Sequence, residues 1–299
     1  MKRCCIYFAF ILLLLASCSK RLDYHINDVG GSEVVNGFTI QWGNGLSEEK
    51  KDVIRNIVND MVYVIGGGFY MGSNKEYDPE ARNNEGPVHY VLLSDYYICS
   101  HELTVEQVAC LFDYPKDIVP KYNRMYVDYD DLKFLIDYIN ESTGLHFDFP
   151  TEAQWEFAAR GGIQTCNFRY PGSDEWDDVW SDGDENSAPS IANELGLFNM
   201  ADGRSEWCKD VYAIYDRYEL VENPCNMYAQ NYPQMGFFRV VRGGCSRSKS
   251  TSKYWFAETL SYSDLDDVRM CRSTARTHYD GESNYITLRP VININDNEK

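Results

Sequence analysis

Thiols and imidazoles are the side chains of this chain that could hold a transition metal, and their spacing is informative. No Cys-x-x-Cys occurs, and the histidines show no His-x-x-x-His spacing. Zinc and non-haem iron sites are built from such ligand sets, so neither metal is expected. Seven cysteines follow position 18, an odd number, so at least one thiol must stay free even where disulfides form: Cys99, Cys110, Cys166, Cys208, Cys225, Cys245 and Cys271.

Acidic residues dominate the charge of the chain. Its formal net charge is −18, and no Lys/Arg stripe with interleaved aromatic residues occurs. Phosphate repulsion would therefore oppose binding to nucleic acid, which we exclude as a partner. Seven of the carboxylates lie between Asp174 and Glu185 without a basic residue among them. Such a run is typical of a solvated loop and is also suited to binding a cation.

Hydrophobic periodicity predicts the elements that must position these side chains. Ser47 is a typical N-cap for a helix with apolar residues at helical spacing, and a second amphipathic helix is predicted over residues 130–140. Alternation predicts strands within residues 61–73 and 88–98. Thr151 and Gln154 form a capping box at the start of a further helix. From residue 163 onward turn-forming residues dominate, so we expect a single, loop-rich α+β domain.

The N-terminus has the form of an export signal. Lys2 and Arg3 precede an apolar run over residues 6–15, which is too short to span a bilayer but has the length of a secretory h-region. The run ends in Leu15-Ala16-Ser17-Cys18, which resembles a bacterial lipobox. Residues 1–17 are therefore interpreted as a lipoprotein signal peptide; the alternative is an ordinary secretory signal followed by a chance cysteine.

Cleavage before Cys18 would make this cysteine the lipid attachment site. Several acyl chains on one residue hold a protein to a membrane far more firmly than one chain does. Residues 18–45 are then expected to form the lipidated N-terminus and a tether. Ser19, which is not acidic, favours the outer membrane over the inner one, so we expect a lipid-anchored protein of the cell envelope.

Two sequence motifs are more specific than packing in a core or the formation of a turn requires. They are Phe149-Pro-Thr-Glu-Ala-Gln-Trp-Glu-Phe-Ala-Ala-Arg-Gly-Gly162 and Gly196-Leu-Phe-Asn-Met-Ala-Asp-Gly-Arg-Ser-Glu-Trp207. With Arg242-Gly243-Gly244 they resemble the formylglycine-generating enzyme, or sulfatase-modifying factor, family, and the resemblance extends over residues 61–292. It implies a compact variant of the C-type-lectin-like architecture. We place this domain at residues 46–295.

The resemblance implies a copper site that this chain lacks. Family enzymes oxidise a cysteine of a sulfatase peptide to formylglycine with molecular oxygen, using copper held by two cysteines after Arg-Gly-Gly. The first position falls here on Ser248, and the second on Lys253 or, counted back from Arg276, on Val268. These side chains cannot replace soft Cu(I) ligands, so copper is not expected and no catalytic residue is assigned. Cys245 and Cys271 remain as a candidate non-standard pair of thiols.

A calcium site is also implied by the resemblance. Its ligands would be the side chains of Asn199 and Glu206 and the backbone carbonyls of Asp202 and Arg204. Hard oxygen ligands of this kind suit calcium. The alternative is that Glu206 pairs with a neighbouring arginine or caps backbone amides.

Four arginines, as in the family, are expected in or near the core, where a planar guanidinium can bridge carboxylates and carbonyls: Arg242, Arg272, Arg276 and Arg289. A structural role is favoured for them over ligand binding.

Three functions remain open at this point. The first is an envelope lipoprotein whose domain is catalytically silent and binds or assembles an envelope protein or peptide. The second is a divergent formylglycine-generating oxidase that acts on a sulfatase or another envelope protein through Cys245 and Cys271. The third is a calcium-dependent glycan-binding module, which only the lectin-like architecture and the acid-rich loops suggest.

Overall fold

The computed structural model describes residues 29–114, 127–179, 191–201, 205–215, 220–227, 238–243, 272–279 and 286–294. Its helices are α2 (Glu48–Asn59), α3 (Val105–Leu111), α4 (Tyr129–Thr143), α5 (Glu152–Ala159) and α6 (Trp176–Val179). Short 3-10 helices cover Asn83–Glu85 and Gly162–Gln164. No helix in the described ranges has both the length and the apolar character needed to cross a bilayer.

The strands form small sheets. β1 (Val29–Val35) pairs with β2 (Phe38–Gly43), and a second sheet has the order β3 (Met61–Val64), β6 (Tyr96–Cys99), β13 (Val291–Asn293), β7 (Phe147–Asp148). A third has the order β4 (Gly67–Met71), β5 (His89–Leu93), β9 (Val221–Glu222). The fourth has the order β11 (Thr277–Tyr279), β10 (Arg239–Arg242), β8 (Ser205–Val211), β12 (Ile286–Thr287).

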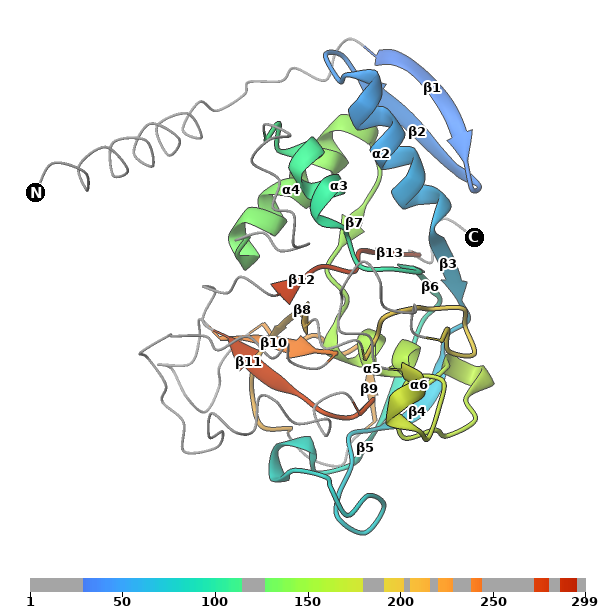
Figure 1. Cartoon of the computed structure of the whole chain (residues 1–299), viewed down its shortest axis with the longest axis vertical. Helices are drawn as coiled ribbons and strands as arrows, with labels where there is room; N and C mark the ends of the chain where they lie inside the picture. Colours follow the sequence, from blue (N-terminus) through green and yellow to red (C-terminus); the bar gives the residue numbers. More distant parts are fainter. Residues whose placement is uncertain are drawn as a thin grey trace, which may run out of the picture.

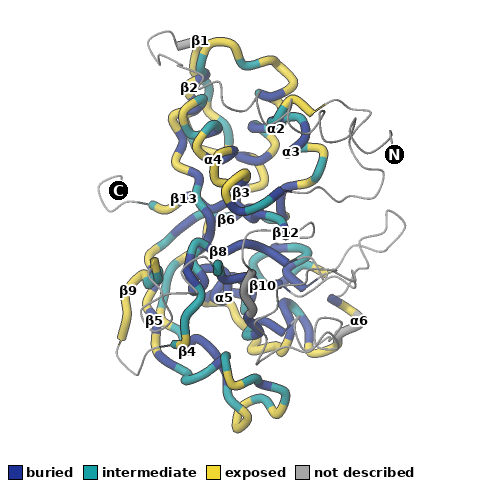
Figure 2. Tube along the Cα trace, turned by 90° about the vertical axis from the view of Figure 1, so that its left-hand side faces the viewer, coloured by how far each residue is buried: buried dark blue, intermediate teal, exposed yellow. Residues whose placement is uncertain are grey.

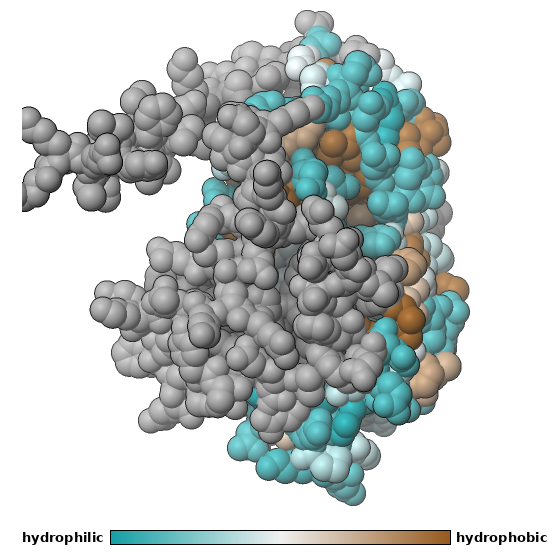
Figure 3. Space-filling view, viewed as in Figure 1, coloured by the Kyte–Doolittle hydropathy of each residue, from teal (hydrophilic) through white to brown (hydrophobic). Residues whose placement is uncertain are grey.

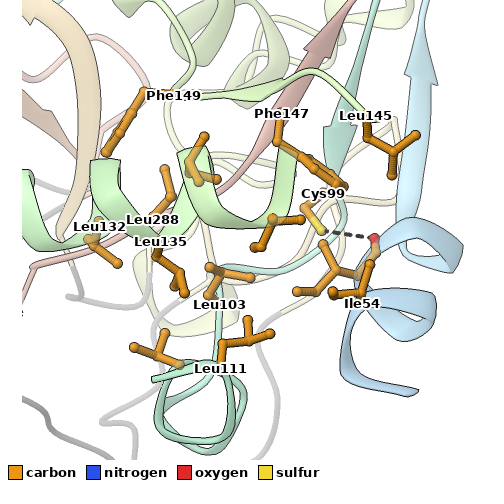
Figure 4. Packing of buried hydrophobic residues seen from close by; sticks show 14 of the residues in the cluster. Ile54, Cys99, Leu103, Leu111, Leu132, Leu135, Leu145, Phe147, Phe149 and Leu288 are labelled. Carbon is orange, nitrogen blue, oxygen red and sulfur yellow. Dashed lines mark hydrogen bonds between the residues drawn. The ribbon is translucent and has the colours of Figure 1, made fainter. Parts of the chain in front are cut away.

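The helices α2, α3 and α4 gather at one end of the molecule with the β1–β2 hairpin (Figure 1). Their apolar stripes meet in one core cluster that includes Ile54, Leu111 and Leu135 (Figure 4). The thiol of Cys99 lies in this cluster and donates to the carbonyl of Ile57 at 3.5 Å. Both helices predicted from periodicity are confirmed, and the side chain of Ser47 accepts the backbone N–H of Lys50 as expected of an N-cap.

The hairpin differs from the sequence-based expectation, which placed residues 18–45 in a tether. Residues 29–43 instead form β1 and β2, and Ile40 and Trp42 on β2 are buried. The turn residues Asn36 and Gly37 have φ of 48° and 82°, the left-handed values that an Asn-Gly hairpin turn requires. The signals for the hairpin are the Asn36-Gly37 pair and the two-residue alternation of residues 38–43, which precede the first helical periodicity.

The other end of the molecule is built around α5, all of whose residues are buried. The expected capping box is confirmed: Thr151 Oγ1 accepts the backbone N–H of Gln154, and Gln154 Oε1 accepts that of Thr151. Trp155 and Phe157 belong to a second core cluster with residues of β4, β5, β6 and β8. Figure 2 shows buried chain continuing through the middle of the molecule around α5 and β8.

Candidate functional site

An open groove of about 820 Å³ lies where β4 ends and the following loop begins. Its rim carries the aromatic side chains of Tyr70, Tyr77 and Phe168, which are 66%, 74% and 36% exposed. Aromatic residues among a few polar groups are typical of surfaces that bind peptides or proteins. No cysteine or histidine is among the described residues that line the groove, so these residues can bind a ligand but supply no thiol or imidazole.

Gly72 fixes the path of the chain along this groove. Its φ is +87°, and a Cβ at this position would lie 2.3 Å from the carbonyl oxygen of Glu85. The backbone N–H of Gly72 donates to Glu156 Oε1 at 2.8 Å, and its carbonyl accepts from Arg160 at 2.8 Å. Only glycine combines this conformation with so close an approach of two backbones.

Arg272 precedes Ser273 and Thr274, which line the groove, and its side chain contacts Asp78, another lining residue. Its guanidinium donates to both carboxylate oxygens of Glu85 and, at 2.7 Å, to Asp78 Oδ2. Thr274 Oγ1 donates to Glu85 Oε2 at 2.7 Å. The hydroxyl of Ser273 is buried, lines the groove and has no hydrogen-bond partner within the described part of the chain. A buried hydroxyl of this kind is a candidate contact for a ligand.

The charges at the rim are held in place by ion pairs. Arg169 Nη2 lies 2.9 Å from Asp78 Oδ1, and the backbone N–H of Arg169 donates to Asp174 Oδ1 at 2.9 Å. Burial opposes ionisation of Asp78, but the backbone N–H of Glu80 and the guanidinium of Arg272 hold the pKa of its carboxyl below the usual value. The groove therefore presents fixed charges of both signs beside its aromatic side chains.

Behind the groove, two buried arginines share one carboxylate. Glu152 accepts from Arg242 Nε at 3.0 Å, from Arg276 Nε at 2.6 Å and from Arg276 Nη2 at 2.8 Å. Arg242 Nη2 also donates to Glu156 Oε2 at 2.8 Å. Although Glu156 is buried, Arg160 and Arg242 hold its pKa below the usual value. The structural role predicted for these arginines is confirmed.

Glu206, a predicted calcium ligand, is the partner of Arg289 in the structure. Arg289 Nη2 donates to Glu206 Oε1 at 2.7 Å, Arg289 Nε donates to Oε2 at 3.0 Å, and Trp155 Nε1 donates to Oε2 at 2.8 Å. Burial raises the pKa of Glu206, and Arg289 opposes that shift. The ion pair that was left open as an alternative is thus present.

The remaining members of the predicted calcium site are only partly described. Asn199 has φ of 61°, and its side-chain amide lies 3.5 Å from Glu102 Oε1. Asp202 and Arg204 lie outside the described residues. No group of three or more His, Cys, Asp or Glu side chains suited to a metal occurs among the residues whose placement is given. Calcium at this loop, with Asn199, Asp202, Arg204 and Glu206 as ligands, stays a prediction.

The described thiols do not resemble a copper site. Cys99 and Cys208 are buried in different core clusters, and burial raises the pKa of both, that of Cys99 to about 12. A protonated thiol in an apolar core is a poor metal ligand. The lipid attachment site Cys18 and the candidate thiols Cys245 and Cys271 lie outside the described residues.

The fold and these motifs define the family. The chain belongs to the sulfatase-modifying factor enzyme 1-like domain family, whose model matches residues 47–294. The expected α+β fold of formylglycine-generating enzymes in a single domain is therefore confirmed. The solved structure of Treponema denticola variable protein 1 superimposes with a TM-score of 0.57 and 15% identity, covering 88% of this chain and 98% of that one, which supports the fold alone.

Two curated relatives carry different names. The chain is 29% identical over 230 residues to the serine/threonine-protein kinase pkn1 of Chlamydia caviae, which covers 68% of this chain and 36% of that protein. It is 34% identical over 115 residues to the formylglycine-generating enzyme of Thermomonospora curvata, covering 32% of this chain and 37% of that protein. The chain thus spans about a third of the length of the curated relatives it matches.

The groove itself was not predicted from the sequence. Its lining comes from β4, the loop after it, the segment after α5 and the residues after Arg272, which are far apart along the chain. Exposed tyrosines at positions 70 and 77 beside Gly72 were a signal that could have indicated this surface.

Proposed function

We propose that this chain is a lipid-anchored protein of the cell envelope whose sulfatase-modifying-factor-like domain is catalytically silent and acts as a binding or assembly module. One observation carries the proposal: the positions where the family holds copper are Ser248 and Lys253 or Val268, and none of them is a thiol. Without soft ligands at these positions the domain lacks the family's way of holding Cu(I) beside a substrate thiol.

The groove supports a binding role. It retains a shaped surface with exposed Tyr70, Tyr77 and Phe168 and with the unpaired hydroxyl of Ser273. A segment of an envelope protein could place apolar side chains against the aromatic rings and polar groups against the fixed charges. The lipid at Cys18 would hold this groove at the membrane, on our interpretation the outer membrane.

Catalytic silence is tested by incubating the purified chain aerobically with copper and a sulfatase peptide that carries the target cysteine. Mass spectrometry would report formylglycine as a loss of mass at that cysteine. We expect no conversion, while the Thermomonospora curvata enzyme converts a peptide that it accepts under the same conditions. Catalytic conversion by this chain would overturn the proposal.

The binding role is tested with a photo-crosslinking amino acid at Tyr77, expressed in cells. The matched control carries the same amino acid at Phe134, which is 54% exposed on α4, away from the groove. We expect a discrete crosslinked envelope protein from position 77 and none from position 134. Equal crosslinking from both positions would show that the groove has no special role.

A divergent oxidase is the second candidate, because the described flanks of Cys245 and Cys271 lie close together. Arg242 Nη1 donates to the carbonyls of Ser273 and Ala275 at 3.3 and 3.1 Å, and β10 pairs with β11. This candidate predicts uptake of one Cu(I) per chain that is lost in the Cys245→Ser/Cys271→Ser double variant. Equal copper binding by the double variant and the unaltered chain would eliminate it.

A further inference from the structure

A second cavity of about 220 Å³ lies on the other side of the end of β4. Met71 lines this cavity, whereas the adjacent Gly72 lines the groove, so a short piece of backbone separates the two. Apolar walls come from Met71, Val221 and Pro224. Val221 is 40% exposed, which places it at the mouth of the cavity. A cavity of this size holds a ligand of about eight non-hydrogen atoms, since one of ~150 Å³ binds benzene.

The carboxylate of Asp210 lines this cavity and forms no ion pair within the described ranges. The side chain is 5% exposed, and its two oxygens accept the backbone N–H groups of Glu152 at 2.8 Å and Asn226 at 2.7 Å. No lysine, arginine or histidine in the described ranges forms an ion pair with it. Lys209, its neighbour in sequence, pairs with Asp148 instead. Burial, reinforced by nearby Glu152, raises the pKa of Asp210 to about 7.

His89 adds an acceptor to the same cavity. Its side chain is nine-tenths buried, and Nδ1 lies 3.0 Å from the carbonyl oxygen of Pro87. A carbonyl can only accept, so Nδ1 carries a proton, and in a ring with that single proton Nε2 is the acceptor. Nε2 has no hydrogen-bond partner among the residues that the structure describes, and His89 lines the cavity.

The other charged groups at the cavity are satisfied among themselves. Arg276 uses Nε and Nη2 on Glu152 and Nη1 on the carbonyls of Asn84 and Ala213. Glu152 is neutralised by Arg276 and Arg242 together. Among the described residues at the cavity, this leaves the Asp210 carboxylate without an ion-pair partner and His89 Nε2 without a hydrogen-bond partner, beside an apolar wall. A ligand that fits must donate hydrogen bonds, carry a positive charge and have a small apolar body.

We propose that this cavity binds a small organic ammonium compound, whose charged nitrogen donates to Asp210 and His89 and whose apolar body lies against Met71, Val221 and Pro224. The site goes beyond the function proposed above and does not depend on it, because the groove and the cavity are lined by different residues. Bound ammonium would give the buried carboxylate an ion-pair partner.

Benzylammonium and benzyl alcohol are the matched probes, since they share a body of suitable size and differ in the charge of one group. Isothermal titration of the purified full chain should show saturable binding of one benzylammonium per chain. Binding of the alcohol should be at least about tenfold weaker, which corresponds to ~1.4 kcal/mol. Absence of saturable benzylammonium binding, or equal affinity for both probes, would overturn the proposal.

Three variants locate the binding site. Val221→Trp fills the mouth of the cavity from an exposed position, and Asp210→Asn removes the charge; each should weaken binding at least about tenfold. Asp137→Asn removes a charge on the exposed face of α4 and should bind as the unaltered chain does. Because Asp210 also holds two backbone amides, its variant could fail to fold. Val221→Trp then decides alone, and unchanged benzylammonium binding by that variant would refute the site.

Discussion

Arginines in the interior of this protein are bound to acids that lie far away in the sequence. Arg289 contacts Glu206 across 83 residues, and Arg276 contacts Glu152 across 124. A planar guanidinium can meet a carboxylate with two parallel hydrogen bonds, which fixes both the distance and the orientation of the segments that carry them. These contacts therefore hold the loops of a fold with little regular structure.

Replacing Glu206 with glutamine should test this role. The shape is kept, but Arg289 loses its counter-charge in a buried site, and breaking such a pair costs about 3–5 kcal/mol. Urea unfolding followed by tryptophan fluorescence would measure the loss. The control is Asp137→Asn, whose pair with Lys133 is about half exposed and should contribute less than about 0.5 kcal/mol. Similar losses from both variants would contradict the structural role of Glu206.

Asp210 should make stability depend on pH. Its pKa is about 7 in the folded chain against an ordinary 3.8, so the folded state holds its proton more tightly than the unfolded state does. The free energy of unfolding should therefore fall as pH rises from about 4 to 7, by up to ~4 kcal/mol from this group, since each pKa unit is worth about 1.4 kcal/mol.

The measurement is the difference in unfolding free energy between the unaltered chain and Asp210→Asn at pH 5 and pH 8. The unaltered chain should lose stability relative to the variant at the higher pH. Glu152 and Arg276 act on Asp210 through their charges, and both are present in the two proteins. A difference that does not change between the two pH values would show that Asp210 is not the titrating group.

At the scale of elements, capping residues determine where a helix begins, and contacts with distant segments determine which part of the core it packs against. Ser47, Thr104 and Thr151 each cap a helix with a side-chain oxygen, as their positions before apolar runs indicate. The β1–β2 hairpin combines both kinds of signal. Its Asn-Gly turn is local, but its stabilising contacts are non-local, because Ile40 and Trp42 pack in the core with residues of α2 and α4.

The hairpin should be part of the cooperative fold. Ile40→Ala empties a fully buried site and should lower the unfolding free energy by about 2–5 kcal/mol. Val34→Ala, on the neighbouring strand at 69% exposure, should change it by less than about 0.5 kcal/mol. Chemical denaturation of both variants measures the difference. If the Ile40→Ala and Val34→Ala proteins were equally stable, residues 29–43 would not be part of the cooperative fold and would act as a tether.

At the scale of the whole molecule, the chain combines a net charge of −18 with an N-terminal segment that we predict to be an export signal. In the view of Figure 3 the described surface is mostly hydrophilic, with apolar residues in small patches. Patches of that size are normal for a protein that faces water. Membrane association, as we propose it, comes from the lipid at Cys18.

Lipidation is tested by labelling cells with a palmitate analogue. The unaltered chain should incorporate the label, and Cys18→Ser should not, because the acylated residue is removed. The control is Cys4→Ser/Cys5→Ser, which changes two thiols within the predicted signal peptide and should leave labelling intact. Labelling of the Cys18→Ser chain would contradict the predicted attachment site.

The sequence determined the features that depend on a few adjacent residues: the caps and apolar faces of the helices, the family motifs, and the missing thiols at Ser248 and Lys253. It also indicated that the four arginines have structural roles. Their partners were decided by the tertiary structure, which joined Arg289 to Glu206. The groove and the cavity with Asp210 and His89 were decided there too. Each brings together residues from several distant segments, and loop-rich chains carry no local pattern that encodes which segments meet.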